Sequence, residues 1–83
     1  MTGWLRIIGL GPGGPALRTP EAEAALAAAT DLVGYGPYVA RVAARPEQRR
    51  HATDNRQELE RARHALEMAQ AGARVAVVSS GDA

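Results

Sequence analysis

The chain has no cysteine and no phenylalanine, and aromatic residues make up only 4% of its 83 residues. Without cysteine it has neither a disulfide framework nor thiolate chemistry. Without bulky aromatic side chains, its core has to be built from small aliphatic residues, each of which buries little apolar area. A chain of this length is one small domain or part of one, and its core is expected to be thin.

The chain also lacks an excess of charge of either sign and any long apolar run. Its formal net charge is +1, which gives no electrostatic argument for binding nucleic acid. No apolar stretch approaches the length of a membrane span, and the first residues lack the basic and apolar segments of a signal peptide. We therefore expect a cytoplasmic protein that binds neither nucleic acid nor membrane. His51 and His64 lie far apart in the sequence, and no metal site is expected.

What the chain does have is a short apolar strand that breaks into a turn rich in glycine and proline at residues 7–15. Glycine lets a ligand approach the backbone, and proline stiffens the turn by fixing φ. Gly9, Gly11 and Gly14 also fit the dinucleotide pattern G-x-G-x-x-G. However, the helix start signal Thr19-Pro20 comes only later, and the acid that would bind a ribose is missing. The loop is therefore expected to bind a small molecule other than a dinucleotide. The two alternatives are a dinucleotide site and a plain strand-to-helix turn without a ligand.

Strand and helix patterns alternate along the rest of the chain. The expected strands are residues 4–8 (buried), 31–35 and 74–78, with a further short strand near Arg50, and the expected helices are residues 19–30, 37–44 and 54–71. This alternation predicts an α/β fold with a parallel sheet and right-handed crossovers. The carboxyl ends of parallel strands align, so the loops at 9–15 and 79–82 should meet at one edge, where such folds bind ligands.

The clearest predicted helix is 54–71. Asp54 and Gln57 have the spacing of a capping box, and Gly72 supplies a stop signal. The apolar residues expected on its inner face are Leu59, Ala62, Leu66 and Ala69.

The second loop, Ser79-Ser80-Gly81-Asp82, combines two hydroxyls, a glycine and a carboxylate. This set suits a neutral or cationic ligand that is recognised through hydrogen bonds, and it would repel a phosphate. The alternative is that Asp82 caps a following helix.

Together these motifs resemble the N-terminal part of the tetrapyrrole methylases, which are S-adenosylmethionine-dependent enzymes of cobalamin and sirohaem synthesis. The resemblance covers essentially the whole chain. It is carried by the G-x-G-P-G loop at 9–13, the helix start at 17–20, the Thr-Asp-Leu-Val-Gly-Tyr strand at 30–35 and the Val-Ala-Val-Val-Ser-Ser-Gly-Asp segment at 75–82. The Val-Gly-Tyr strand, followed by Tyr38, and the Ser-Ser-Gly-Asp loop are most similar to the branch that methylates C17 of precorrin-3B and contracts the macrocycle.

The resemblance implies that residues 1–83 are an incomplete N-terminal α/β domain with a parallel sheet, and that a C-terminal domain is absent. The cofactor implied is S-adenosyl-L-methionine, held between the two domains, and the substrate implied is a tetrapyrrole. The residues implied at the cofactor are Pro12, Ser80, Gly81 and Asp82, and those implied beneath the tetrapyrrole are Gly9, Gly11 and Gly13. With half of a site, the chain alone is expected to be inactive. Its short length, its core rich in alanine and valine and an uncovered sheet edge predict weak stability or association as a homodimer.

No catalytic residue is predicted. Uroporphyrinogen methylases carry an aspartate after the strand tyrosine, and this chain has Gly36 there. The sequence shows no histidine–carboxylate pair, no metal cluster and no activated nucleophile, so alignment of the reacting atoms is the expected contribution to catalysis. The alternative functions are a nucleotide-binding oxidoreductase and a non-enzymatic α/β interaction module.

Overall fold

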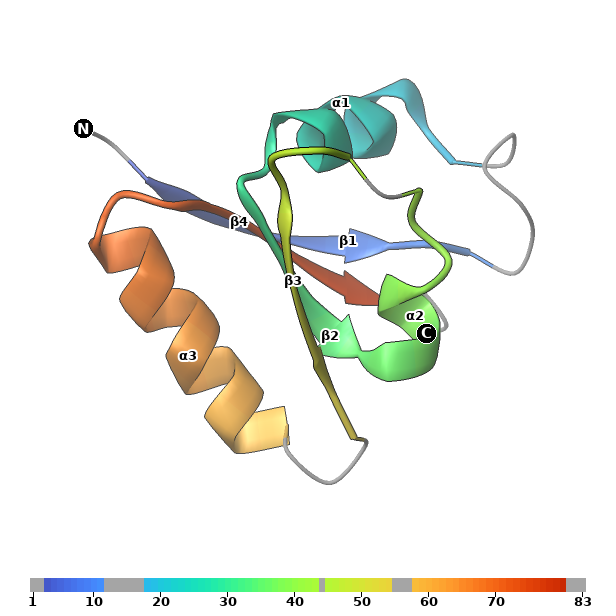
Figure 1. The fold of residues 1–83 in the computed structure, drawn as a ribbon. Coiled ribbons are helices and arrows are strands. Elements are labelled where there is room, and N and C mark those ends of the chain that lie inside the picture. The colour runs from blue at the N-terminus through green and yellow to red at the C-terminus, as the bar shows by residue number, and fades with distance from the viewer. Residues whose placement is uncertain (1–2, 12–17, 44, 55–57, 81–83) are drawn as a thin grey trace.

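Four parallel strands form one sheet in the order β1-β4-β2-β3 (Figure 1). The computed structural model describes residues 3–11, 18–43, 45–54 and 58–80. Its elements are β1 (Trp4–Gly9), α1 (Pro20–Ala28), β2 (Asp31–Tyr35), α2 (Gly36–Val39), β3 (Arg49–Thr53), α3 (Glu58–Gln70) and β4 (Arg74–Ser79). The predicted α/β fold with a parallel sheet is confirmed, including the short strand near Arg50.

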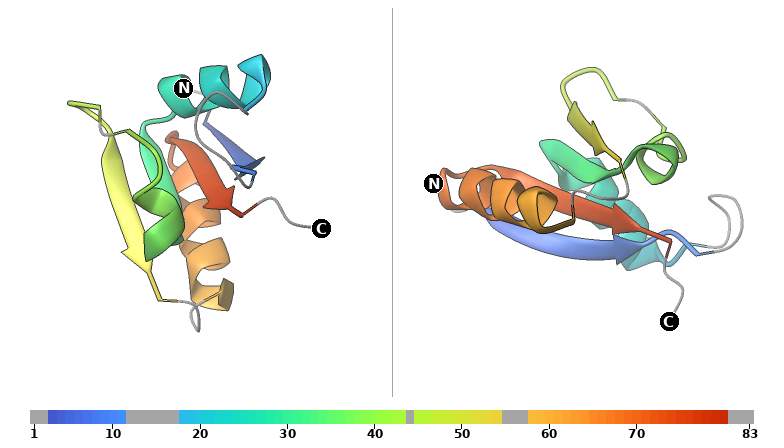
Figure 2. Two further views of the ribbon diagram at one scale, coloured as in Figure 1. Left: turned by 90° about the vertical axis from the view of Figure 1, so that its right-hand side faces the viewer. Right: turned by 90° about the horizontal axis from the view of Figure 1, so that it is seen from below.

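The sheet is covered on both faces, by α1 and α2 on one side and α3 on the other (Figures 1 and 2). Successive residues of a strand point to opposite faces, so Leu32 joins the core under α1 and α2, whereas Val33 joins the core under α3. The first core consists of Ile8, Leu10, Ala25, Leu26, Ala29, Leu32, Val39, Val42, Ala76 and Val78. The second consists of Val33, Ala65 and Val75. The predicted inward position of Leu26 is confirmed.

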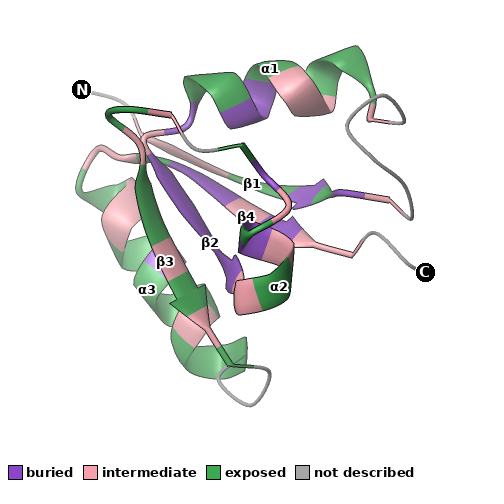
Figure 3. Cartoon of the chain, turned by 45° about the vertical axis from the view of Figure 1, so that its right-hand side comes forward, coloured by how far each residue is buried: buried purple, intermediate pink, exposed green. Residues whose placement is uncertain are grey.

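The central strands β2 and β4 hold most of the buried residues of the sheet, and Figure 3 shows the contrast with its edges. In β4, Val75 and Ala76 are fully buried. The prediction of a buried strand at residues 4–8 is wrong for part of its length, because β1 pairs only with β4 in the described sheet and Ile7 is 74% exposed. An apolar run specifies a strand, but the strand order decides whether that strand has a neighbour on each side.

Helix α3 is turned relative to its predicted orientation. Ala65 is its buried residue, and Met68 and Ala69 pack beside Ala65 on the second core. Leu59 and Leu66, both expected to face inward, are 73% and 53% exposed. Of the four predicted inner residues, only Ala69 packs on this core. The contact line runs through Ala65 and Met68, nearly one residue position away from the predicted line.

The helix boundaries follow local signals where the structure describes them. The Thr19 side chain accepts a hydrogen bond from the Ala22 amide, and Pro20 occupies the first turn of α1, as predicted. Gly72, with a φ of 105°, follows α3 and confirms the predicted stop. Helix α2 is shorter than the predicted 37–44. Gln57 of the expected capping box lies outside the described residues.

The close approach of β4 to β2 depends on the absence of a side chain at Gly34. A Cβ on Gly34 would lie 2.7 Å from Val78 Cγ2 and 2.8 Å from the Val78 carbonyl oxygen. We expect Gly34→Ala to lower the free energy of unfolding by about 1–3 kcal/mol, since backbone would have to move. In the control Gly36→Ala the nearest atoms lie at 3.9 and 4.0 Å, and the change should stay within about 0.5 kcal/mol. Equal urea denaturation midpoints for the two variants would contradict this interpretation.

Candidate functional site

The two loops predicted to meet at the carboxyl edge of the sheet do meet there. Gly9 pairs in register with Ser79. Beyond the strands, the Leu10 amide donates to the Ser79 carbonyl and the Gly11 amide donates to the Ser80 carbonyl, each at 2.9 Å. The glycine segment and the serine segment therefore form one continuous backbone surface, which brings Gly9, Gly11 and Ser80 together.

The other four predicted site residues, Pro12, Gly13, Gly81 and Asp82, lie outside the described residues. Their roles stay predictions.

Gly11 leaves open space at this edge. Its φ of 74° lies in the region that favours glycine, and a Cβ at this position would meet no atom within 4 Å. Glycine is favoured here by the positive φ of the backbone, since a Cβ at this position would clash with no neighbouring atom. A flat ligand could lie against the exposed backbone here, so the described part of the edge fits the predicted site.

The end of β2 contributes an aromatic pair to the same edge. The rings of Tyr35 and Tyr38 meet edge to face, with their centroids 5.3 Å apart. Tyr38 also packs against the first core. Gly36 lies between them at the start of α2, where its carbonyl accepts a hydrogen bond from the Ala40 amide. Where uroporphyrinogen methylases carry an aspartate, this chain therefore has no side chain.

Arginine side chains hold this edge in a way that the sequence does not reveal. Arg41 Nη2 donates to the Gly11 carbonyl at 2.5 Å. Arg18 Nη2 donates to the Arg41 carbonyl at 3.0 Å, and Arg18 Nη1 pairs with Glu23 Oε1 at 3.3 Å. In the sequence these arginines are scattered, and their acceptors are mainly backbone carbonyls of distant segments. No residue pattern marks such contacts.

The structure contains a histidine–carboxylate pair, which corrects the prediction that there is none. His51 Nε2 lies 2.8 Å from Asp31 Oδ2, and the Thr30 hydroxyl donates to Asp31 Oδ1 at 2.7 Å. His64, on α3, places its ring edge to face with that of His51 at a centroid distance of 5.1 Å. The β2–β3 register aligns His51 with Val33, two residues beyond Asp31 on the same face. Sequence reasoning missed the pair because only strand pairing brings it together.

Asp31 is ionised in this pair. Burial raises the pKa of Asp31, but hydrogen bonds from Thr30 and His51, with the charges of His51 and Arg49, outweigh burial and hold its pKa below 3.8. The carboxylate therefore accepts, and His51 donates from Nε2. Asp31 opens β2 on the α3 face, away from Gly11 and Ser80, so the pair fastens edge strand β3 to β2. Among the residues that the structure describes, no three histidine or acidic side chains gather to hold a metal ion.

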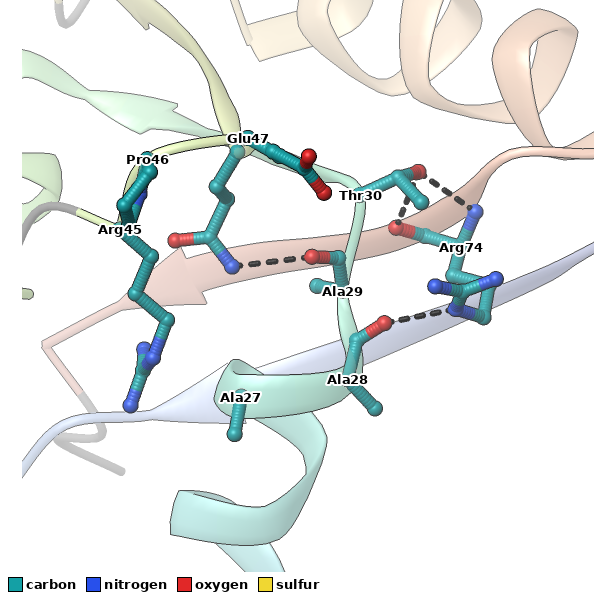
Figure 4. A pocket seen from close by; sticks show the side chains of 9 residues that line it. Ala27, Ala28, Ala29, Thr30, Arg45, Pro46, Glu47 and Arg74 are labelled. Carbon is teal, nitrogen blue, oxygen red and sulfur yellow. Dashed lines mark hydrogen bonds between the residues drawn. The ribbon is translucent and has the colours of Figure 1, made fainter.

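An open pocket of about 540 Å³ lies at the opposite, amino end of the strands (Figure 4). Two of its polar side chains, Gln48 and Arg74, cap the end of α1. Gln48 Nε2 donates to the carbonyls of Leu26 and Ala29 at 2.7 and 2.9 Å, and Arg74 Nε donates to that of Ala28 at 2.6 Å. The last turn of a helix leaves such carbonyls without helical partners. We assign this pocket to helix capping.

Comparison with known sequences assigns the chain to a family. The sequence profile of the tetrapyrrole (corrin/porphyrin) methylases matches residues 5–83. The chain belongs to the tetrapyrrole methylase family. The predicted membership is confirmed.

The similar proteins are longer than this chain. It is 51% identical over 82 residues to a precorrin-3B C(17)-methyltransferase of Sinorhizobium sp, covering 99% of this chain and 32% of that protein. It is 52% identical over 82 residues to the cobalamin biosynthesis protein CobIJ of Mycobacterium tuberculosis, covering 16% of that protein. The crystal structure of the methyltransferase CobJ superposes with a TM-score of 0.93 at 64% identity, over 98% of this methylase chain and 34% of CobJ. The chain thus spans between 16% and 34% of the length of these relatives.

No helix in the described ranges is both long enough and apolar enough to cross a membrane.

The lowered pKa of Asp31 predicts acid sensitivity. The folded state binds a proton at Asp31 less readily than the unfolded state, so its ionised form stabilises the fold above pH 3.8, and this stability is lost as the pH falls through the lowered folded pKa. Asp31→Asn should reduce the free energy of unfolding by about 1–3 kcal/mol at neutral pH and flatten its decline below pH 4. Urea denaturation across pH measures both effects.

The matched control is Glu67→Gln, which neutralises an exposed carboxylate on α3. It should keep the acid decline of the parent protein. An unchanged decline in Asp31→Asn would show that Asp31 does not couple to folding.

Proposed function

We propose that residues 1–83 form the N-terminal α/β part of a longer S-adenosylmethionine-dependent methyltransferase that acts on a tetrapyrrole, precorrin-3B, in cobalamin biosynthesis. A C-terminal domain would supply the second wall of the site. The relative named for this activity aligns with 99% of this chain at 51% sequence identity. Membership of a methylase family favours this function over a nucleotide-binding oxidoreductase or a non-enzymatic interaction module.

One observation carries the proposal: the backbone surface formed by residues 9–11 and 79–80 at the carboxyl edge. The side chains of these residues carry no charge, and the surface is open at Gly11, where a Cβ would meet no atom within 4 Å. When bound, S-adenosylmethionine supplies an electrophilic methyl group. The described residues at the edge need to supply only a surface that orients the reactants, and alignment alone accelerates such reactions strongly.

The residues follow the resemblance. Ser80 is proposed at the cofactor, together with Pro12, Gly81 and Asp82, and the tetrapyrrole is proposed to lie over Gly9, Gly11 and Gly13. A carboxylate at Asp82 suits a cofactor that carries positive charge and hydroxyl groups. A homodimer and a cytoplasmic location are proposed with this function.

The full-length enzyme that carries residues 1–83 should bind S-adenosylhomocysteine, the demethylated product, and not NAD. In a dinucleotide fold the glycine loop leads directly into a helix whose N-terminus binds the pyrophosphate. Here residues 15–18 separate Gly14 from Thr19, the N-cap of α1. Calorimetric titration with each ligand measures the difference. Binding of NAD without binding of S-adenosylhomocysteine would refute the proposed function.

Asp82 distinguishes ligand binding from helix capping. In the full-length enzyme, Asp82→Ala should weaken S-adenosylhomocysteine binding by about 1–3 kcal/mol, because the ligand would lose a hydrogen-bonding partner. Asp82→Asn should have a smaller effect if the side chain acts through hydrogen bonds. A lower melting temperature with unchanged affinity would identify Asp82 as a cap.

A further inference from the structure

Gly11 is the point where the two loops of the carboxyl edge are joined, and both of its polar groups are engaged. Its amide donates to the Ser80 carbonyl at 2.9 Å, and its carbonyl accepts from Arg41 Nη2 at 2.5 Å. The following residue in the sequence is Pro12, whose nitrogen carries no hydrogen. The Gly11 carbonyl is therefore the one polar group of that peptide link, and Arg41 binds it.

A glycine at a φ of 74° has no side chain that would hold its conformation, and glycine crosses to other backbone regions at little cost. The orientation of the Gly11 carbonyl therefore depends on its hydrogen-bond partner. A guanidinium is a strong donor for this purpose, because a hydrogen bond from a charged group is about twice as strong as a neutral one.

Arg41 is itself fixed on the core. Its amide donates to the Tyr38 carbonyl at 3.1 Å. Its neighbours Val39 and Val42 are buried, at 3% and 2% exposure. Arg50 Nη1 donates to the Val39 carbonyl at 3.0 Å, and Arg50 Nη2 donates to the Val42 carbonyl. The backbone from which Arg41 reaches Gly11 is therefore rigidly placed.

A second arginine connects this segment to α1. The Arg18 side chain is only 4% exposed, and it joins Glu23 to the Arg41 carbonyl through its two terminal nitrogens. Hydrogen bonds and an ion pair thus run without a break from α1 through Arg18, Arg41 and Gly11 to Ser80. This path connects one covering helix to both loops of the ligand edge.

We infer that Arg41 is a positioning residue: it fixes the Gly11 peptide and so the spacing between the glycine and serine loops against which the ligands lie. The inference rests on the proposed function for its catalytic consequence. Arg41 acts here through the backbone of Gly11. Lysine is a poor substitute, because it lacks the planar fork of the guanidinium.

The test compares Arg41→Met, Arg41→Lys and Arg74→Met in the full-length enzyme that carries residues 1–83. Hydrogen exchange at the Gly11 amide, followed by NMR of ¹⁵N-glycine-labelled protein, reads the position of the loop. Methyl transfer to precorrin-3B, measured as kcat and KM, reads the reaction. Arg74→Met is the matched control, because Arg74 also donates to a backbone carbonyl, that of Ala28, but lies at the opposite end of the sheet from Gly11.

In Arg41→Met we expect Gly11 exchange to accelerate about tenfold and kcat to fall about ten- to hundredfold, with the KM for the tetrapyrrole changed less than about threefold. Arg41→Lys should lie between this variant and the parent, and it keeps the test available if Arg41→Met does not fold. Arg74→Met should lower the melting temperature and leave Gly11 exchange unchanged.

Unchanged Gly11 exchange in the Arg41 variants overturns the inference. A rise confined to the tetrapyrrole KM and fully reversed by lysine also overturns it, since Arg41 would then bind the substrate directly. If Gly11 exchange is faster in the Arg41 variants but the parent enzyme transfers no methyl group to precorrin-3B, the positioning role is supported and the proposed function is refuted.

Discussion

Strand β4 pairs in parallel with β1 on one side and with β2 on the other, and this pairing determines which loops and side chains meet. The register that aligns Gly9 with Ser79 brings the glycine and serine loops together at the carboxyl edge. The register that aligns Gly34 with Val78 requires a residue without a side chain in β2. Both ends of the sheet depend on this arrangement, with α1 capped at the amino end and the glycine and serine loops joined at the carboxyl end.

Side-chain donors on backbone carbonyls complete a fold whose apolar core is small. Arg18, Arg41, Arg50 and Arg74 each donate to a carbonyl in a segment that is distant in the sequence or lies between elements. Gln48 does the same at the end of α1. Hydrogen bonds from charged donors are worth about 1.5–3 kcal/mol each. In a chain without phenylalanine, these contacts hold connecting segments that large apolar side chains would otherwise anchor.

Local features of the sequence determined the fold class and one edge of the molecule. The alternation of apolar strands and helices predicted a parallel sheet, and Thr19 and Pro20 began α1 as their chemistry requires. The same alternation placed the loops containing Gly11 and Ser80 at one edge, because parallel strands end on the same side. These predictions held since each depends on residues close together in the chain, or on a rule that all parallel sheets obey.

Only the tertiary structure decided the strand order, the orientation of α3 and the side-chain partners. The exposure of Ile7 follows from the position of β1 at an edge, and the way α3 packs on the sheet buries Ala65 and leaves Leu66 exposed. The Asp31–His51 pair and the Arg41–Gly11 contact join positions 20 and 30 residues apart. The sequence by itself encodes helix, strand and turn preferences locally. Contacts between distant segments depend on register and packing, which arise only when the whole sheet has formed.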